Sequence, residues 1–413
     1  PTPVPTPAPT PAPACSEHAC PTNYVRKPGA DGIFGDTDNV CCDEDGDGDG
    51  VRDEDDVWPE DPSRAAWSST SAVALSTDHS CAVLTNGDVK CWGDAYKYTC
   101  YDKVKRGGSA GTMGDNLPAF DLGSGAMAQQ VIAGPNYVCA LLAGGAVKCW
   151  GAVGWLLCPD STVGMGDHLP AVLLGSPAVK IAGGGRHACA ILDGGSLKCW
   201  GEGFGPGYNE FGHLVKWEAE KAVILEDVKD IAAGGQMTCA VLGDGSVKCW
   251  GVFSHWGGAL GQERIGGIIY RPDDSAVVNL GSDGTSDLRA QSVAVGYDIT
   301  CVLLDIGDVK CWGWNIQGGL GYNDRRHRGG EAGTMGDNLP TVDIGGKATA
   351  IAPGKEMTCA LLVGGKVKCW GNGGLGRLGY GDTTTRGRSY YMTCDMGDCL
   401  PYVDLGHSEV AVQ

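Results

Sequence analysis

The chain has 413 residues, enough for a large core, and a formal net charge of −19 from 50 acidic and 31 basic residues. This balance argues against nucleic acid as a partner, and no run of 18 apolar residues is present that would span a membrane. The 20 cysteines favour an oxidising compartment, so we expect a secreted or cell-surface protein. Because the sequence begins at Pro1 rather than Met, we expect a processed or partial chain.

Residues 1–14 open with a strict alternation of Pro with Thr, Val or Ala, which favours an extended polyproline II conformation. Two interpretations remain open: a plain spacer, or a stalk that carries O-linked sugar. The alternation also resembles the hydroxyproline-rich glycoproteins of plant and algal surfaces, and that resemblance implies sugar on proline as well. The candidate glycosylation sites are Thr2, Pro3, Pro5, Thr6, Pro7, Pro9, Thr10, Pro11 and Pro13.

Residues 15–66 form an acidic, cysteine-containing segment. Oxygen ligands at calcium-loop spacing come from Asp45, Asp47, Asp49, the Val51 carbonyl, Asp53 and Asp56, with Gly50 at the sharp turn. The last ligand is Asp rather than Glu, and the pattern resembles a thrombospondin type-3 calcium repeat. That resemblance implies that Asp36 and Asp38 add ligands to a second ion. We expect a structural calcium site, the alternative being a solvated acidic linker.

One motif occurs six times in residues 67–413, and its copies begin 50 to 62 residues apart, as expected of a repeat architecture. Each copy begins and ends with Cys and is followed by Trp-Gly. Two apolar runs flank a three-residue loop that ends in Gly, which predicts a β-hairpin with that Gly in the left-handed conformation. The copies are Cys81–Cys91, Cys139–Cys149, Cys189–Cys199, Cys239–Cys249, Cys301–Cys311 and Cys359–Cys369.

Folding each hairpin places its two cysteines opposite each other, within disulfide range, so we predict six disulfides inside the hairpins. Cys100 and Cys158 lie in loops after adjacent repeats and are a candidate bridge between them, and Cys394 and Cys399 are a candidate small loop. The connectivity of the N-terminal cysteines stays open; these are Cys15, Cys20, Cys41 and Cys42.

A short apolar strand precedes each hairpin, and four of the long loops end in a further apolar segment, as in Leu117-PAFDLG. About four strands per repeat is the content of a β-propeller blade. We expect the repeated Trp to fill the core between blades, and the Lys that precedes the second Cys to extend to a rim.

The motif C-A-L-L-x-x-G-x-V-K-C-W-G resembles the regulator of chromosome condensation repeat family, and above all its secreted, cysteine-paired branch. The resemblance covers about residues 67–413 and implies an all-β propeller. Six repeats are complete, and residues 409–413 (Glu-Val-Ala-Val-Gln) restart the first strand of another. Six blades and seven blades therefore both remain possible.

No catalytic motif is found, and the variable residue types at the repeat position of His79 and His187 favour packing over catalysis, so we expect no enzyme. Three long loops carry cations, which either contact acidic or glycosylated surface on another subunit or are ordinary solvated charge. These are Lys103, Lys105, Arg106, Arg325, Arg326, Arg328, Arg386 and Arg388. The leading functional hypothesis is an extracellular structural glycoprotein that assembles into oligomers or filaments. The alternative is a secreted module that captures another protein through its long loops.

Overall fold

The computed structural model describes residues 24–26, 42–44, 73–76, 79–93, 106–107, 112–151, 165–201, 225–253, 258–263, 267–269, 272–388 and 395–405. The chain divides into two compact units, Pro1–Thr70 and Ser71–Gln413. The described part of the first unit is an antiparallel pair, β1 (Tyr24–Arg26) and β2 (Cys42–Glu44). The predicted calcium ligands and the proline-rich stalk lie outside the described residues.

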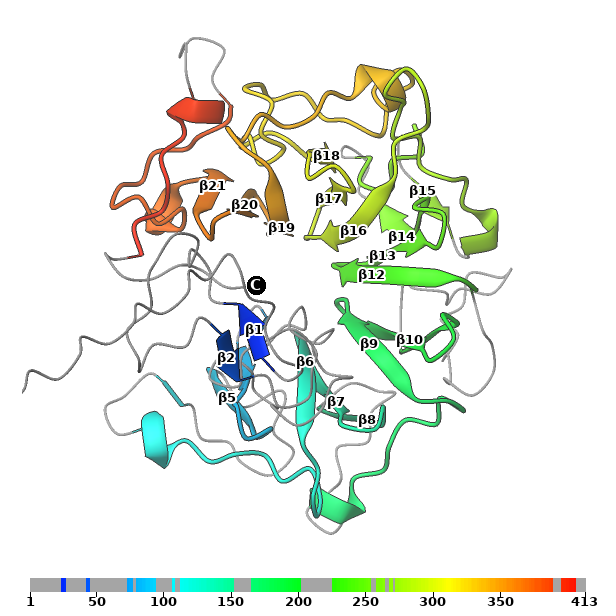
Figure 1. Cartoon of the computed structure of the whole chain (residues 1–413), viewed down its shortest axis with the longest axis vertical. Helices are drawn as coiled ribbons and strands as arrows, with labels where there is room; N and C mark the ends of the chain where they lie inside the picture. Colours follow the sequence, from blue (N-terminus) through cyan, green and yellow to red (C-terminus); the bar gives the residue numbers. More distant parts are fainter. Residues whose placement is uncertain are drawn as a thin grey trace, which may run out of the picture. The chain divides into compact units, whose positions relative to one another are not determined.

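Among the described residues, the second unit consists of six antiparallel sheets, which follow one another around a centre, and the first strand of the second to sixth sheets lies innermost (Figure 1). This confirms the predicted all-β propeller. We call the sheets blades 1 to 6. The first three are β3 (Val73–Leu75), β4 (His79–Val83), β5 (Val89–Gly93); β6 (Ala128–Gly134), β7 (Tyr137–Leu142), β8 (Val147–Gly151); and β9 (Ala178–Gly183), β10 (His187–Leu192), β11 (Leu197–Gly201). The others are β12 (Val228–Gly234), β13 (Met237–Leu242), β14 (Val247–Phe253), β15 (Gly267–Ile269); β16 (Ala290–Val295), β17 (Ile299–Leu304), β18 (Val309–Gly313); and β19 (Ala348–Pro353), β20 (Met357–Leu362), β21 (Val367–Gly371).

Each blade contains the predicted hairpin between its second and third strands. The two cysteines of every copy are directly paired in register and joined by a disulfide. The predicted glycines have φ between 74° and 83°, as the left-handed end of a three-residue loop requires. These are Gly87, Gly145, Gly195, Gly245, Gly307 and Gly365.

The predicted fourth strand per blade is not confirmed; β15 adds a strand to blade 4, but it pairs with residues 251–253 of β14, away from the position of the predicted segments. The apolar segment expected to form it is instead held by a single backbone hydrogen bond, such as Phe120 N–H to the Val89 carbonyl at 2.8 Å. Pro118 and Pro340 open two of these segments without an N–H to donate, which limits ladder formation. A short 3₁₀ turn precedes most of them; the 3₁₀ turns are η4 (Gly114–Asn116), η5 (Gly166–His168), η6 (Pro272–Asp274), η7 (Gly336–Asn338), η8 (Gly374–Gly376) and η9 (Gly397–Cys399).

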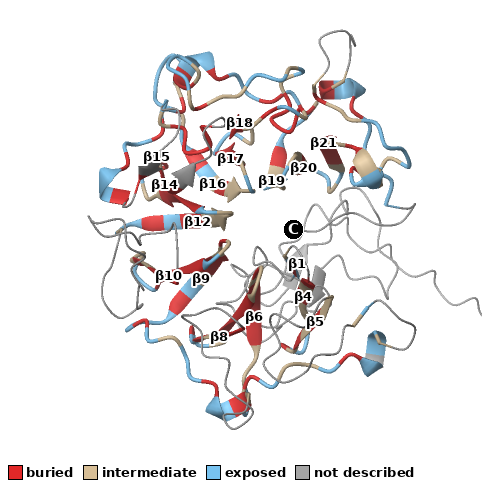
Figure 2. Ribbon diagram, turned by 180° about the vertical axis from the view of Figure 1, so that it is seen from behind, coloured by how far each residue is buried: buried red, intermediate tan, exposed pale blue. Residues whose placement is uncertain are grey.

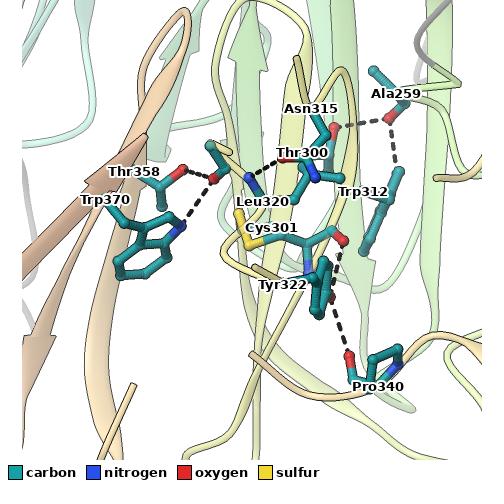
Figure 3. The surroundings of a disulfide bond; sticks show 12 residues. Ala259, Thr300, Cys301, Trp312, Asn315, Leu320, Tyr322, Pro340, Thr358 and Trp370 are labelled. Atoms are coloured by element: carbon teal, nitrogen blue, oxygen red, sulfur yellow. Dashed lines mark hydrogen bonds between the residues drawn. A yellow bond between two sulfur atoms is a disulfide. The ribbon is translucent and has the colours of Figure 1, made fainter. Parts of the chain in front are cut away.

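The repeated tryptophans lie in the core between blades, as predicted, with five of the six buried. Buried residues are concentrated in the strands of the blades, whereas many exposed residues lie in the connections (Figure 2). The indole Nε1 of Trp312 donates to the Ala259 carbonyl of blade 4 at 2.9 Å, and the Thr300 hydroxyl donates to the same oxygen at 2.8 Å (Figure 3). Ala259 belongs to a Gly-x-Leu-Gly turn, residues 258–261. We call this arrangement of turn, Trp and Thr the interblade contact. Blade 6 repeats it with Trp370 and Thr358 on the carbonyl of Gly319.

The expectation that the repeated Lys extends to a rim is wrong for blades 5 and 6, where it is buried. The ammonium of Lys310 donates to the carbonyls of Leu280 at 2.6 Å and Gly336 at 3.3 Å. Burial lowers the pKa of Lys310 and of its equivalent Lys368. A buried amine needs acceptors, and here they come from the connections before and after the blade, so the side chain joins them.

We expect Gly307→Ala to lower the free energy of unfolding by about 1–2 kcal/mol, because a Cβ is disfavoured at its φ of 79°. The added Cβ would also lie 3.1 Å from Cβ of Lys347. Gly346→Ala is the control, since its Cβ would meet only Leu362 Cδ1 at 3.8 Å. Chemical denaturation measures the stability of both variants. Equal stabilities would contradict the left-handed conformation assigned to Gly307.

Candidate functional site

The long loops of blades 5 and 6, as far as the structure describes them, lie on one face of the propeller. In blade 5, Ile299 pairs with Gly313, so the turn between the first two strands lies beside the loop that follows the third. The N–H of Trp314 donates to the Asp298 carbonyl at 2.9 Å and joins the two segments. Blade 6 is built in the same way. We call this side the loop face, and the side that carries the hairpin loops, such as residues 305–307, the hairpin face.

The innermost turns of the loop face pack backbone to backbone. A Cβ at Gly296 would lie 2.1 Å from the Gly354 carbonyl oxygen, and one at Gly234 would lie 2.3 Å from the Gly296 oxygen. Only glycine fits such approaches. Next to them Tyr297 is 56% exposed, and the ammonium of Lys355 lies 5.5 Å from the centre of its ring.

The long loop of blade 5 is held by three side chains. The Tyr322 hydroxyl donates to the carbonyl of Cys311 and accepts from its N–H, both at 3.0 Å. Arg328 forms a bidentate ion pair with Asp324 at 3.0 and 2.8 Å, and its guanidinium lies 4.1 Å from the centre of the Tyr322 ring. We call this the Tyr-Asp-Arg clasp; bidentate geometry and stacking make it stiffer than a simple surface ion pair.

Blade 6 repeats the clasp with Tyr380, Asp382 and Arg386. The guanidinium binds Asp382 at 3.0 and 2.8 Å and lies 4.2 Å from the centre of the Tyr380 ring. Hydrogen bonds from Arg386 and the Thr384 N–H lower the pKa of Asp382 to about 2. Burial raises the pKa of Tyr380.

Asn315 organises the start of the blade 5 loop from a fully buried position. Its amide nitrogen donates to the carbonyl and carboxylate of Asp324, and its amide oxygen accepts from the N–H of Leu320. The Asn315 N–H donates to Nδ1 of His327, whose pKa is lowered mainly by burial. The loop is thus fixed by a satisfied polar network rather than by apolar packing.

Exposed side chains of two kinds remain on the loop face. Ile316 and Leu375 are apolar and exposed, the latter at 93%. Leu375 also has φ of 63°, a left-handed conformation that is unfavourable for a branched, non-glycine residue. The second kind is cationic. We call the exposed apolar, aromatic and cationic side chains of this face the loop-face patch: Tyr297, Ile316, Leu375, Arg325, Arg326 and Lys355.

The predicted cationic residues separate into different groups. Arg328 and Arg386 belong to the clasps, and Arg388 donates to Oε1 of Gln317 across blades 5 and 6 at 2.9 Å. Arg106 exchanges backbone hydrogen bonds with Gly93. Arg325 and Arg326 are exposed. Lys103 and Lys105 fall in the part of the chain that the structure leaves undescribed.

The remaining predicted residues are only partly described. Cys399 is disulfide-bonded, whereas its expected partner Cys394, like Cys100 and Cys158, lies outside the described ranges. His187 is fully buried, its Nε2 lies 2.7 Å from the Thr238 hydroxyl, and burial lowers its pKa to about 4, which suits packing. Within the described ranges, no three His, Cys, Asp or Glu side chains cluster as metal ligands would. No helix in those ranges has the length and apolarity to cross a bilayer.

Sequence reasoning missed the clasps and the apolar members of the patch. A signal for the clasps was present, since Gly-Tyr-x-Asp-x-x-x-Arg-Gly occurs at residues 321–329 and again at 379–387. No sequence signal identifies Leu375, because a Leu between glycines also fits a buried turn, as at Leu320.

Comparison with known proteins supports the repeat assignment. The model of the regulator of chromosome condensation (RCC1) repeat matches residues 71–97, 178–205, 228–255 and 290–318. The E3 ubiquitin-protein ligase MYCBP2 of Danio rerio is 34% identical over 93 residues, 22% of this chain and 2% of that protein. The ultraviolet-B receptor UVR8 of Arabidopsis thaliana is 30% identical over 95 residues, 23% of this chain and 20% of that protein.

Two solved structures share the fold at low identity. Yeast RCC1 (Prp20) bound to Kap60 has a TM-score of 0.59 at 18% identity, covering 80% of this chain and 74% of that one. Human WBSCR16 has a TM-score of 0.59 at 16% identity, covering 81% of each chain. The chain therefore contains RCC1-like repeats in an RCC1-type β-propeller.

We expect Asp382→Asn to destabilise the protein at pH 5 and to lose this effect toward pH 2. The folded-state pKa of Asp382, about 2, lies below the ordinary 3.8, so its stabilising contribution is present above about pH 4 and disappears as pH falls through 2. Urea midpoints from pH 5 to 2 measure the difference. Asp305→Asn, in an exposed turn of the hairpin face, controls for loss of one surface carboxylate. A pH-independent difference would contradict the clasp.

Proposed function

We propose that this propeller is a non-enzymatic, extracellular protein-binding module that captures its partner through the loop-face patch. The observation that supports this most is Leu375, a nearly fully exposed leucine held in a left-handed backbone conformation. Strained backbone with an exposed apolar side chain is costly and tends to mark functional sites. Burial of Leu375 by a partner would offset that cost.

The rigidity of the surrounding loops suits binding. The clasps, Asn315 and the hairpin disulfides fix the loop backbone before any partner arrives. A pre-organised surface loses less conformational freedom on association, so more of the contact energy appears as affinity.

The chemistry of the patch favours an acidic protein surface with an apolar centre. Arg325, Arg326 and Lys355 are exposed cations on the same face as the apolar side chains, on a chain whose net charge is −19. Local charge of opposite sign to the rest of the protein steers an acidic partner to this face. Prp20p of Saccharomyces cerevisiae, another propeller of this fold, has binding properties to Gsp1p and histones, so the fold binds proteins in that case.

An extracellular location is proposed from the cysteines. The second unit has six disulfides in the described residues, and such density is typical of oxidising compartments. The proposal includes structural calcium in the acidic segment and sugar on the N-terminal stalk, both argued from sequence.

A second candidate is a structural glycoprotein whose copies assemble into oligomers or filaments. It is favoured by the exposed cations of the loop face together with nine acidic residues within 43–56 of the same chain. Contacts between these regions of different copies would depend on charge.

The triple variant Arg325→Glu, Arg326→Glu, Leu375→Asp is expected to reduce partner capture by at least about tenfold, or ~1.4 kcal/mol. The matched control is Ile306→Asp with Val363→Asp, two exposed side chains on the hairpin face, which should leave capture unchanged. Quantitative affinity capture from the extracellular fraction compares them. Loss of capture in the control alone would place the binding surface on the hairpin face.

Mass measurement by light scattering separates the two candidates. A binding module remains a monomer with calcium and with chelator, and at low and moderate salt. A structural subunit forms oligomers that dissociate as salt rises, because the contact is between charged surfaces. Dissociation on chelation would give calcium a role in assembly, and a salt-independent oligomer would contradict both.

A further inference from the structure

The boundary between blades 3 and 4 lacks the hydrogen bonds that hold the two boundaries after it. Trp250 pairs in register with Thr238, whose hydroxyl contacts blade 3, so the indole lies on the same side of the sheet. Its Nε1 is buried and has no hydrogen-bond partner within the described part of the chain. Lys248 donates to the Pro272 carbonyl after its own blade at 3.1 Å. Among the described residues it has no bond to the connection before that blade, unlike the equivalent lysines of blades 5 and 6.

Two side-chain pairs cross this boundary instead. Nε2 of His187 in blade 3 lies 2.7 Å from the hydroxyl of Thr238 in blade 4. The ammonium of Lys180 in blade 3 binds the carboxylate of Asp230 in blade 4 at 2.6 Å. One backbone hydrogen bond between the innermost turns also crosses here, as one does between blades 5 and 6. Both side-chain pairs contain a group that gains a proton in acid, the imidazole in one and the carboxylate in the other.

The neighbouring boundaries depend on groups that do not gain a proton in mild acid. Between blades 2 and 3, the Tyr137 hydroxyl donates to the Gly184 carbonyl at 2.9 Å. The amide of Gln130 exchanges two hydrogen bonds with the backbone of Ile181, each at 2.9 Å. The boundaries before blades 5 and 6 have the interblade contact, in which Trp and Thr donate to a backbone carbonyl. Mild acid therefore acts first on the boundary between blades 3 and 4.

The surroundings of His187 favour the neutral imidazole. The residue is 2% exposed, and its partner Thr238 is fully buried. A Cβ on Gly184 would lie 2.8 Å from Nδ1, so the backbone packs closely against the ring. The next residues on the same face, Cys189 and Ile191, belong to the apolar core shared with blade 4. A charge at this position is separated from water, and burial accordingly lowers the pKa of His187 to about 4.

The charged and titratable groups of the neighbouring strands supply no free counter-ion. The Tyr137 hydroxyl of β7 contacts the His187 carbonyl, and burial raises the pKa of Tyr137, so this group is neutral in acid. Asp230 is the acidic residue of β9 to β14, and its carboxylate is already used by Lys180 and by the N–H of Val293 at 2.8 Å. The remaining charged residues of these strands and their inner turns are cations: Arg186, Lys198, Lys229 and Lys248.

We propose that the boundary between blades 3 and 4 is an acid-opened seam, in which protonation of His187 separates the two blades while the boundaries on either side stay closed. Separation lets the imidazolium reach water, which the closed boundary does not allow. Blades 1 to 3 and blades 4 to 6 then remain joined through the chain between β11 and β12. The loop-face patch lies wholly on blades 5 and 6, so this inference does not depend on the proposed function.

The direction of the pH effect follows from proton linkage. The pKa of His187 in the closed boundary, about 4, lies below the ordinary 6.5, so the closed form is fully stabilised above about pH 6.5 and loses this stabilisation as the pH falls toward 4. With the ordinary pKa restored on opening, the ratio of open to closed boundary rises by up to about 300-fold over this window, because each pKa unit is a factor of ten.

The repeated tryptophans report on the boundaries, because Trp250, Trp312 and Trp370 each face the preceding blade. Hydroxyl-radical footprinting with mass spectrometry measures the oxidation of each one. Between pH 7 and pH 4.5 we expect oxidation of Trp250 to rise by about fivefold or more, and that of Trp312 and Trp370 to change by less than about twofold. An equal rise at all three would indicate global unfolding, and no rise at Trp250 would indicate a boundary that stays closed. Either result would overturn the proposal.

His187→Met removes the titrating group and introduces the residue type that blades 4 and 6 have at this position, as Met237 and Met357. It should abolish the rise in Trp250 oxidation between pH 7 and pH 4.5. The matched control is Lys180→Gln, which removes the ion pair and keeps His187. It should raise Trp250 oxidation at both pH values and retain the difference between them. A rise that survives in His187→Met, or disappears in Lys180→Gln, would assign the switch to another group.

A titration of the unmodified protein needs no variant to fold. The midpoint of Trp250 oxidation against pH should lie between 4 and 6.5, where the imidazole gains its proton. A midpoint below about pH 3.5 would assign the opening to carboxylates and overturn the role of His187.

Discussion

Each blade of this protein can bury its second face only against the next blade, and the rest of the structure depends on that constraint. A three-stranded sheet has two apolar faces, and neither the hairpin disulfide nor the backbone ladder covers them. At the boundaries before blades 5 and 6 the interblade contact solves this with one carbonyl each, such as that of Ala259, which accepts from Trp312 and Thr300 of the following blade. The glycines of the turn matter because they let a backbone carbonyl oxygen approach the indole N–H of the Trp closely.

The outer parts of the blades are joined in a different way. The outer segment that follows each long loop forms almost no ladder, so its position depends on side chains. Lys310 binds carbonyls of the connections before and after its blade, and the Asp337 carboxylate accepts from the N–H of Ser282 in the preceding connection. Removal of such a buried amine leaves carbonyls without donors, a cost of ~1–3 kcal/mol for each unsatisfied group. The polar groups of the periphery therefore join neighbouring repeats to each other, as the interblade contacts do in the core.

The parts of this architecture that sequence reasoning predicted are local ones. The hairpins, their disulfides and the left-handed glycines follow from spacing within eleven residues, and all appear in the structure. The predicted fourth strand was not found, because a segment such as Leu117-PAFDLG has strand-like composition but enters through a proline and ends in a Gly turn. The buried state of Lys310 could not be predicted either, since its acceptors lie 30 and 26 residues away. The exposure of Leu375 depends on which surface lies against the loop face of blade 6, and a local sequence pattern does not encode that.

The placement of the disulfides has a mechanical consequence. The six hairpin bridges join residues ten positions apart within one blade, so none of these six crosses a boundary between blades. Tension applied along the chain would load the non-covalent boundaries between blades before it loads any of these six bridges. Each released blade would keep its cysteine-closed hairpin, which shortens the extension gained and leaves a ready template for re-docking. We therefore expect boundaries between blades that carry only these hairpin bridges to separate one at a time under force.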